Sequence, residues 1–455
     1  MVNFGSRFRT PEQMKRTCIL GGGICGLASA WKREREGNGV TVIESSSRVG
    51  GIIQSEKLDG FLLDYGPNTL SLRLRKTMDL LEEAEILEHA IDANPQANKR
   101  FIVRKGKLVA LPHGFASFLS SGFLSPLGKL RLLLEPFTPR GKNRENESVA
   151  SFVSRRLGKE VLEYGANPFL AGIYAARPET LCLRHAFPQL HRMEMENRSL
   201  FMGMARGVGK SEKTPKTRLL SFSGGMNELP TRLQAQLHAK FILDSTVKKV
   251  SRTGDGWSVG FTDSNGALRE NPYDEVICTI PAHKLTLIDW ENVEERDAIP
   301  IMAQAPHFPL SLVFLGFERQ DVSHPLDGFG FLVPEAEQMS ILGTLFSSTL
   351  FPGRAPSGKV LLTTFVGGER NPELALDDEK ELCRKVTDQL SPLLGIRGRP
   401  VLQRVKTWKK AIPLPDIGFD ERKKVAETLR ETNPGLSFSG SHITGPPLPN
   451  CLDVH

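Results

Sequence analysis

The chain has 455 residues, of which 39% are hydrophobic and 24% are charged. This composition excludes a disordered or collagen-like chain and allows a sizeable core in two to three domains. The net charge of +7 is a mild excess, and no basic block is interleaved with aromatic residues, so we expect no nucleic-acid partner.

The six cysteines are scattered and form no C-x-x-C pair, which argues against a disulfide framework and against a metal site. A reducing cytoplasm is therefore the expected location, although Arg7, Arg9, Lys15 and Arg16 leave an organellar location open. No apolar run reaches the roughly 18–20 residues that span a bilayer, so any membrane contact is predicted to be peripheral.

The first predicted elements are a strand over Thr17–Leu20, a helix over Leu27–Arg35 and a strand over Val40–Glu44. Between the first strand and the helix, residues 21–26 read GGGICG and satisfy the G-x-G-x-x-G pattern. This pattern in a strand–loop–helix context predicts a site for the pyrophosphate of a dinucleotide.

The glycines of this loop have separate roles. Gly21 permits the tight turn, Gly23 lets the pyrophosphate approach the backbone, and Gly26 lets the helix pack close to the sheet. Free N–H groups at the helix N-terminus then face the phosphate charge. Glu44 ends the second strand, where a carboxylate accepts a hydrogen bond from a ribose hydroxyl and repels the extra phosphate of NADP.

The next motif favours FAD over NAD. Residues 47–51 read SRVGG and resemble the x-R-x-G-G continuation found in flavin amine oxidases. Arg48, Gly50 and Gly51 can meet a second phosphate and the flavin-side sugar. A further match to that superfamily runs from Gly60 to Pro67.

The rest of the chain alternates between helical and strand patterns. An amphipathic helix is predicted near Lys76–His89, and residues 113–200 are predicted to be mostly helical, with one helix starting after the polar run Glu145–Ser148. Apolar alternation with Gly and Asn turns over Phe241–Gly266 predicts a β-meander. Residues 272–281 are predicted to form a buried strand.

Further strands are predicted over 308–366, followed by a helix over Leu374–Leu390 and a strand over Leu436–Ser439 that ends at Gly440. The apolar stretch over 115–137 carries Lys129 and Arg131. It is predicted either to pack around a substrate tunnel or to lie on a membrane surface.

Several longer motifs resemble the protoporphyrinogen oxidase family of flavin amine oxidases. The resemblance spans residue 17 to about 451. Its motifs are Asn98–Phe101, Leu111–Pro112, Asn167–Tyr174, Leu183–Pro188, Ser221–Met226, Gly328–Pro334, Leu342–Ser348, Thr364–Gly368, Trp408 and Ala411–Pro413.

The resemblance implies an α/β fold, α+β overall, of the flavin amine oxidase type. A Rossmann-like FAD-binding domain would combine residues 15–85, 215–285 and 400–455. A helical, membrane-facing insertion over 96–210 would form the substrate tunnel, and a sheet-based substrate domain would cover 286–399. Family members are often dimers, so the resemblance also allows a homodimer.

The implied activity is oxidation of a porphyrinogen to a porphyrin in haem biosynthesis. The family uses non-covalent FAD, with molecular oxygen as acceptor and hydrogen peroxide as product, and a hydride passes from a methylene bridge to flavin N5. The implied cofactor-binding residues are Gly21, Gly23, Ile24, Gly26, Glu44, Ser45, Arg48, Gly50, Gly51, Gly66, Pro67, Asn68, Thr69, Val247 and Trp408.

The resemblance also assigns a substrate site. Gly172 would lie beside the reacting carbon, where a missing side chain lets backbone and substrate meet. Leu332, Leu345 and Phe365 would form the apolar walls, and Arg100 would grip a propionate. From the residues alone, apolar positions in β-type runs are more often core, and Arg100 could be an ordinary exposed charge.

Three alternatives remain at this point. Coproporphyrinogen III has four propionates and would want more cations than Arg100, and the likeness of the 342–368 block to plant-type enzymes favours protoporphyrinogen IX. Another amine oxidase or desaturase would share the glycine loop. A porphyrin-binding protein without turnover is the third alternative.

The proline-rich turn Gly445–Cys451 and an end at His455 depart from the family and predict weakened FAD binding.

Overall fold

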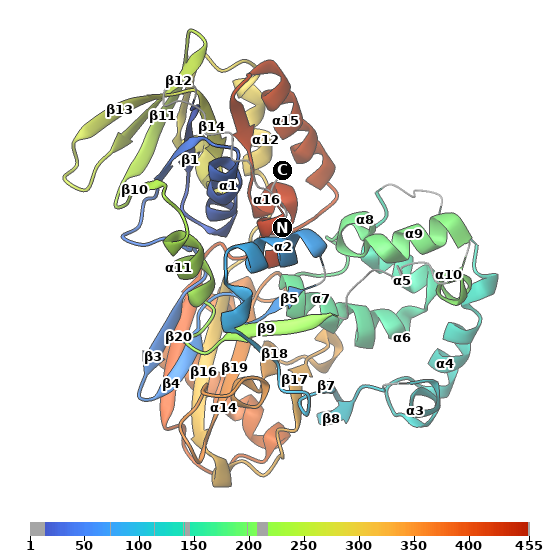
Figure 1. Cartoon of the computed structure of the whole chain (residues 1–455). Coiled ribbons are helices and arrows are strands. Elements are labelled where there is room, and N and C mark those ends of the chain that lie inside the picture. Colours follow the sequence, from blue (N-terminus) through green and yellow to red (C-terminus); the bar gives the residue numbers. More distant parts are fainter. Residues whose placement is uncertain are drawn as a thin grey trace, which may run out of the picture.

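The computed structural model describes residues 14–72, 74–112, 114–139, 141, 146–197, 199–206 and 217–453. Arg7, Arg9 and Glu145, named above, lie outside these residues. Figure 1 shows a parallel sheet with its helices at one end, a large mixed sheet at the other, and a group of helices beside them.

The parallel sheet has the strand order β10-β2-β1-β14-β21, and all of its neighbouring strands run parallel. Its strands are β1 (Arg16–Leu20), β2 (Gly39–Ile43), β10 (Lys240–Ile242), β14 (Glu275–Cys278) and β21 (Leu436–Phe438). Strand β1 is buried on both faces: Ile19 packs with Ala30 of α1 (Ile24–Arg35), whereas Cys18 and Leu20 face the opposite core. The apolar run therefore became a central strand, as both of its faces are covered.

That opposite core is closed by a β-meander and by two helices. The meander has the order β13-β12-β11-β15, with β11 (Thr246–Thr253), β12 (Gly256–Thr262), β13 (Leu268–Tyr273) and β15 (Asp289–Glu291). The helices are α12 (Ile299–Ala303) and α15 (Phe419–Thr432). The predicted Rossmann-like arrangement and the predicted meander are both confirmed.

The second sheet has seven strands in the order β20-β16-β19-β18-β17-β7-β8, and only the β17–β7 pair is parallel. Its strands are β7 (Lys99–Arg104), β8 (Lys107–Ala110), β16 (Leu310–Glu318), β17 (Gly328–Leu332), β18 (Ile341–Leu345), β19 (Lys359–Gly367) and β20 (Leu402–Trp408). Helix α14 (Glu379–Leu394) covers one face of this sheet. Phe61, Leu63 and Ala171 pack on its other face.

The region between β8 and the small strand β9 (Arg218–Phe222) is helical throughout its described part. Its α-helices are α3 (Phe115–Ser120), α4 (Pro126–Leu133), α5 (Val149–Arg156), α6 (Lys159–Val161), α7 (Asn167–Tyr174), α8 (Leu183–Ala186), α9 (Pro188–Asn197) and α10 (Leu200–Ala205). Ser148 caps α5 by accepting a hydrogen bond from the Ser151 N–H. In Figure 1 these helices stand to the side of both sheets.

Two smaller antiparallel sheets, β3-β4 and β5-β9-β6, connect the parts. Their remaining strands are β3 (Ser55–Leu58), β4 (Phe61–Asp64), β5 (Leu70–Leu72) and β6 (Ala90–Asp92), and the neighbouring helices are α2 (Arg75–Glu83), α11 (Glu228–Ala235) and α13 (Ser347–Leu350). After β21 come two short helices, α16 (Ser441–Thr444) and α17 (Leu448–Leu452).

Three predicted elements have different limits. The helix predicted to reach His89 ends at Glu83, because Glu85 has a positive φ of 55° and a separate 3₁₀ turn follows. Residues 272–281 hold the end of β13 and the whole of β14, which belong to two different sheets. The two strands are divided at Asp274, which pairs with Arg16. The helix predicted from Leu374 starts at Glu379, since Asp378 caps it.

The sheets also cross two expected domain boundaries. Strands β7 and β8 were placed in the helical insertion, and β20 in the FAD-binding domain, yet all three are hydrogen-bonded into the seven-stranded sheet. The three-part division of the chain stays a prediction. Strands β7, β8 and β20 are the elements whose sheet lies outside the domain to which they were assigned.

Candidate active site

The glycine loop lies at the carboxyl edge of the parallel sheet, where β1 passes into α1. Gly21 has a φ of +103° and donates its N–H to the carbonyl oxygen of Ile43, 2.8 Å away. A Cβ added to Gly26 would lie 2.0 Å from the Gly21 carbonyl oxygen, so only glycine fits there. A Cβ on Gly23, by contrast, would meet nothing within 4 Å.

The open side of the loop carries helix donors. Gly23 is the N-cap of α1 and provides no side-chain acceptor for the first turn, which begins at Ile24. Uncapped N–H groups and the positive end of the helix dipole together attract an anion. The loop at Gly23 thus has the shape and polarity that a pyrophosphate requires.

Glu44 both shapes the loop and offers acceptors beside it. One carboxylate oxygen accepts only the Gly22 N–H, at 2.7 Å, among the described residues. The other accepts the Ser46 N–H at 2.8 Å, the Ser46 hydroxyl at 2.7 Å and the Ser45 hydroxyl at 3.3 Å. The side chain is half-buried, and each carboxylate oxygen can accept more than one hydrogen bond. A ribose hydroxyl can therefore still bind here.

Arg48 points into its own loop. Its guanidinium donates to the carbonyl oxygens of Val49 at 2.8 Å and of Gly51 at 2.7 Å, and burial lowers its pKa. Gly50 (φ +100°) packs against Pro230, and a Cβ on Gly51 would lie 3.4 Å from the Gly23 Cα. Arg48 thus holds the second glycine turn in shape, and its contact with a phosphate stays a prediction. The two turns are joined by the Gly50 N–H, which donates to the Gly22 carbonyl oxygen at 2.8 Å.

The other predicted cofactor residues surround this edge. Gly66, Pro67, Asn68 and Thr69 are all half-buried, and a Cβ on Gly66 would lie 2.3 Å from the Ile52 carbonyl oxygen. Trp408 donates its indole N–H to the Tyr65 carbonyl oxygen at 2.7 Å, which ties the end of β20 to this segment.

Val247 differs from the rest because its side chain is only 7% exposed and belongs to the core under the meander. The preceding residues lie beside the acid of the second strand: the Ser245 N–H donates to the Glu44 carbonyl oxygen at 2.9 Å. The pairing of β11 with β12 shifts register just after Val247. Any contact of Val247 with a cofactor would therefore come from its backbone.

The predicted substrate residues lie on one face of the seven-stranded sheet. Leu332 stands opposite Gly343, and Gly343 stands opposite Phe365, so the three form a row across β17, β18 and β19. Leu345 is two residues beyond Gly343 and so shares the same face. In strands that are otherwise nearly all buried, these three apolar side chains are only half-buried.

Arg100 joins that face from strand β7. Both Arg100 and Leu345 stand opposite Gly330, which lies between them in β17. The guanidinium is exposed and lies 5.5 Å from the ring centroid of Phe329. Within the described part of the chain it forms no side-chain hydrogen bond or ion pair, so its donors are available to a ligand.

Gly172 faces the same row from helix α7. A Cβ added to Gly172 would lie 2.6 Å from Cδ2 of Leu332. Phe169 and Ile173, one helical turn apart, are each 44% exposed on that side of α7. Sequence reasoning missed these two residues, because their i, i+4 spacing in an apolar run is equally typical of a helix that faces a core.

Several buried groups lie outside this arrangement. His283 and His307 pack edge to face with ring centroids 5.3 Å apart, and burial lowers the pKa of both. Burial, with the nearby His307 and Arg422, lowers the pKa of His442 to about 3. Among the described residues, no group of three or more His, Cys, Asp or Glu side chains is placed to hold a metal ion.

The comparisons with known proteins agree on a flavin enzyme. The model of the flavin containing amine oxidoreductase family matches residues 24–446. Protoporphyrinogen oxidase 2 of Arabidopsis thaliana is 36% identical, over 95% of this chain and 90% of its own. Coproporphyrinogen III oxidase of Bacillus subtilis is 29% identical over 96% of both chains. A crystal structure assigned to a protoporphyrinogen oxidase of Exiguobacterium sp. superposes with a TM-score of 0.80 at 25% identity, covering 96% of both chains.

Proposed function

Because the chain belongs to the family of flavin-containing amine oxidoreductases, with FAD as its cofactor, we propose that it oxidises protoporphyrinogen IX to protoporphyrin IX. Its relatives identify the chain as an oxidoreductase of this family that is related to porphyrinogen oxidases. The observation that carries the proposal is the convergence of Arg100, Leu332, Leu345 and Phe365 on one sheet face opposite Gly172.

This face suits a large apolar ring with an ionised edge. Leu332, Leu345 and Phe365 supply flat apolar walls, and Arg100 supplies a fork of N–H donors at the rim of the sheet. A guanidinium pairs well with a carboxylate because two parallel hydrogen bonds form at once. The proposed pose therefore puts a propionate on Arg100 and a pyrrole edge on the leucines.

The chain's own contribution is to position the substrate. FAD, held at the glycine loop, would supply the electron chemistry by accepting a hydride equivalent from the substrate and passing the electrons to dioxygen. Gly172 and Gly343 lack side chains on the facing elements, and Leu332 takes the space beside each: its Cδ2 would lie 2.6 Å and 3.2 Å from a Cβ added at these two positions. Leu332 lies between these two glycines and fixes how deep the ring can enter.

The pairing of nearby cations supports two propionates rather than four. On β7, Lys99 is paired with Asp327 and Arg104 with Glu160, whereas Arg100 has no carboxylate partner among the described residues. A substrate with four propionates would have to compete with these pairs for cations. We therefore propose protoporphyrinogen IX over coproporphyrinogen III.

Porphyrin fluorescence released from protoporphyrinogen IX by the FAD-loaded protein, above an autoxidation blank, tests the proposal. We expect a fast rise, a loss of about tenfold or more in kcat/KM for Arg100→Ala, and partial recovery for Arg100→Lys. Lys107→Ala on the adjacent strand β8 is the matched control and should behave like the unmodified protein. A preference for coproporphyrinogen III would overturn the substrate, and turnover of amines or polyenes alone would overturn the reaction class.

We also propose that α4 and α10 rest on a membrane surface. Five apolar side chains on and just after α4 are strongly exposed, at 45–84%: Leu127, Leu130, Leu133, Leu134 and Phe137. On α10, Phe201, Met202 and Met204 add 37–50% exposed side chains. No helix within the described ranges is both long and apolar enough to cross a bilayer. A peripheral contact fits an apolar substrate that partitions into lipid.

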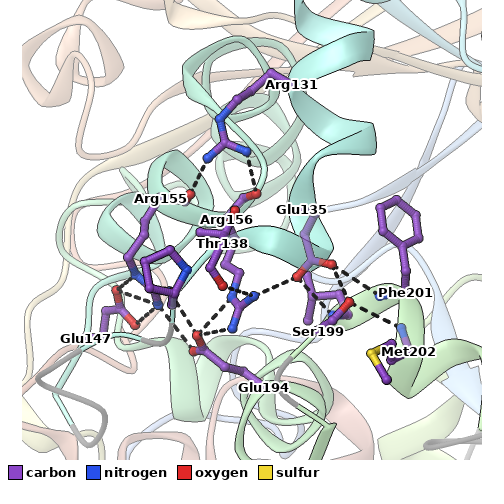
Figure 2. Close-up of polar contacts among 12 residues, drawn as sticks. Arg131, Glu135, Thr138, Glu147, Arg155, Arg156, Glu194, Ser199, Phe201 and Met202 are labelled. Carbon is purple, nitrogen blue, oxygen red and sulfur yellow. Dashed lines mark hydrogen bonds and ion pairs between the residues drawn. The ribbon is translucent and has the colours of Figure 1, made fainter.

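A buried ion network fixes these two helices to each other. Glu135, fully buried after α4, accepts hydrogen bonds from the Ser199 hydroxyl at 2.6 Å and the Leu200 N–H at 3.0 Å, at the start of α10. Figure 2 shows Glu135 between that corner and Arg156, which pairs with it at 3.0 Å. The exposed apolar side chains are therefore presented on a rigid support.

Flotation with vesicles of phosphatidylcholine and phosphatidylglycerol tests this contact. The unmodified protein should float with the vesicles, and a Leu127→Asp, Phe137→Asp double variant should not. Leu268→Asp and Leu287→Asp are matched controls, because both leucines are more than 70% exposed but lie in the meander region. Equal flotation of all variants would rule out α4 as the contact.

A further inference from the structure

The last described helix, α17, packs on α1 beside the glycine loop. Cys451 of α17 and Cys25 of α1 belong to one buried cluster, where they are 3% and 7% exposed. Cys25 is the fifth residue of the loop and precedes Gly26. A bond between these cysteines would join the nucleotide-binding loop to the C-terminal segment.

The two thiols are in direct contact. They are hydrogen-bonded to each other, and the Cys451 thiol also donates to the Gly445 carbonyl oxygen at 3.7 Å. The other four cysteines are also buried and free. Cys18 and Cys278 lie on neighbouring strands but out of register, since Cys18 stands opposite Val276. Cys25 and Cys451 are therefore the pair best placed to react with each other.

The contact makes the two thiols chemically unequal. The hydrogen bond with Cys451, together with burial, raises the pKa of Cys25, whereas the same hydrogen bond lowers the pKa of Cys451. A thiolate is the reactive form of cysteine, so Cys451 is the sulfur that reacts first. Cys25 remains protonated beside it and can react second.

We propose that Cys25 and Cys451 form an intramolecular disulfide when the protein meets a hydroperoxide. The Cys451 thiolate attacks one oxygen of hydrogen peroxide, the O–O bond breaks, and a sulfenic acid and water result. The Cys25 sulfur then attacks that sulfenic acid, a second water leaves, and the S–S bond closes. Two thiols lose two electrons and two protons, and one peroxide becomes two waters.

Access to the pair comes through the C-terminal segment. Helix α17 has five residues. Beyond its buried apolar contacts, it is held by an ion pair in which Lys76 lies 3.2 Å from Asp453, the residue that follows the helix. A helix of little more than one turn can open locally at a lower free-energy cost than global unfolding. Oxidation of the pair should therefore be slower than that of an exposed thiol, yet proceed without unfolding.

Treatment of the full-length, FAD-loaded protein with hydrogen peroxide tests the site. We expect the chain to lose two of its six free thiols, measured with a thiol reagent in denaturant, and to become about 2 Da lighter. Dithiothreitol should reverse both changes. Peptide mapping without reductant should recover one cross-linked pair, from the peptides that contain Cys25 and Cys451.

Single variants separate this pair from the other thiols. Cys25→Ala and Cys451→Ala should each abolish the reversible mass loss, and Cys451→Ala does so without altering the glycine loop. Cys383→Ala, a buried thiol on α14, is the matched control and should still lose two thiols. Retention of all six thiols, a Cys18–Cys278 cross-link or a disulfide between two chains would each overturn the proposal.

Discussion

A Cβ on Gly172 of α7 would lie 2.6 Å from Cδ2 of Leu332 on β17, so the helix and the sheet meet where one residue has no side chain. Gly172→Ala should therefore push Leu332 toward the substrate face. We expect the protein to fold, because the clashing atom is the far end of a flexible side chain, and to lose about tenfold or more in kcat/KM. Steady-state porphyrin fluorescence measures this loss.

The matched control is Gly165→Ala, whose new Cβ would make ordinary contacts at 3.6 Å and 3.8 Å. The double variant Gly172→Ala, Leu332→Val should recover part of the loss, because contacting residues couple. Equal activity of Gly172→Ala and Gly165→Ala would contradict the proposed place of the substrate.

Two glycines of the nucleotide loop should separate cofactor binding from folding. In Gly23→Ala the added Cβ meets no protein atom within 4 Å, so thermal stability without FAD should be unchanged while the Kd for FAD rises roughly tenfold or more. In Gly26→Ala the Cβ would lie 2.0 Å from a backbone oxygen, so folding itself should suffer. Flavin fluorescence quenching and thermal melts distinguish the two; tight FAD binding by Gly23→Ala would argue against the pyrophosphate position.

The ion network of the helical region should make a large contribution to stability (Figure 2). Arg156 is fully buried between Glu135 and Glu194, at 3.0 Å and 2.8 Å. Burial alone would raise the pKa of Glu194, but hydrogen bonds from Arg155 and Arg156 lower it. Arg156→Met leaves the Glu135 carboxylate buried without its cation, and should reduce the free energy of unfolding by about 3–5 kcal/mol.

Urea unfolding of the unmodified protein and the variant measures this reduction. Arg384→Met is the control, because Arg384 forms an exposed ion pair with Glu381 and its removal should change stability by about 0–1 kcal/mol. A change below about 1 kcal/mol in Arg156→Met would show that the network is dispensable.

Stability should fall in mild acid because of the buried His442 and the half-buried His283 and His307. Burial, followed by repulsion from His307 and nearby cations, lowers the pKa of His283 to about 4, and burial lowers that of His442 to about 3. An unfolded histidine titrates near about 6.5, so the unfolded chain binds more protons below that pH. The stability contributed by each neutral histidine is therefore complete above about pH 6.5 and is lost as the pH falls toward the folded pKa.

Urea unfolding at about pH 7, 6 and 5 gives the slope, which should be small near pH 7 and approach about 1.4 kcal/mol per pH unit for His442 and for His283 as the pH falls below about 6. His442→Gln should reduce the number of protons taken up on unfolding by about one, and so lower the slope of stability against pH. His238→Gln, at an almost fully exposed position, should leave it unchanged. An unaltered slope in His442→Gln would mean that other groups control acid stability.

Local patterns in the sequence predicted the nucleotide edge well. The glycine loop, both flanking strands and Glu44 stand where spacing placed them, because each depends on neighbours within about 30 residues. Arg48 shows the limit of such reasoning. Arginine is a residue type that binds phosphate, but here its guanidinium donates hydrogen bonds to backbone carbonyl oxygens. Only the folded loop shows which acceptors lie nearest.

The substrate face depended on information that no local pattern contains. Leu332, Leu345 and Phe365 lie in apolar runs that look alike at every position, and only strand register shows that they share a face with Arg100. The same holds for β7 and β20, whose sheet partners lie far away in sequence. Phe169 and Ile173 were missed because an apolar helix face looks the same whether it meets a core or a ligand.

The strand order of the parallel sheet has a consequence for biosynthesis. Strand β1 ends at Leu20, yet the sheet beside it is completed by β14 and then by β21, which ends at Phe438. During translation the glycine loop therefore leaves the ribosome soon before β2 but long before β14 and β21, which complete the sheet. Flavin loading should be a post-translational event, and nascent chains interrupted before β21 should emerge as apoprotein that depends on chaperones.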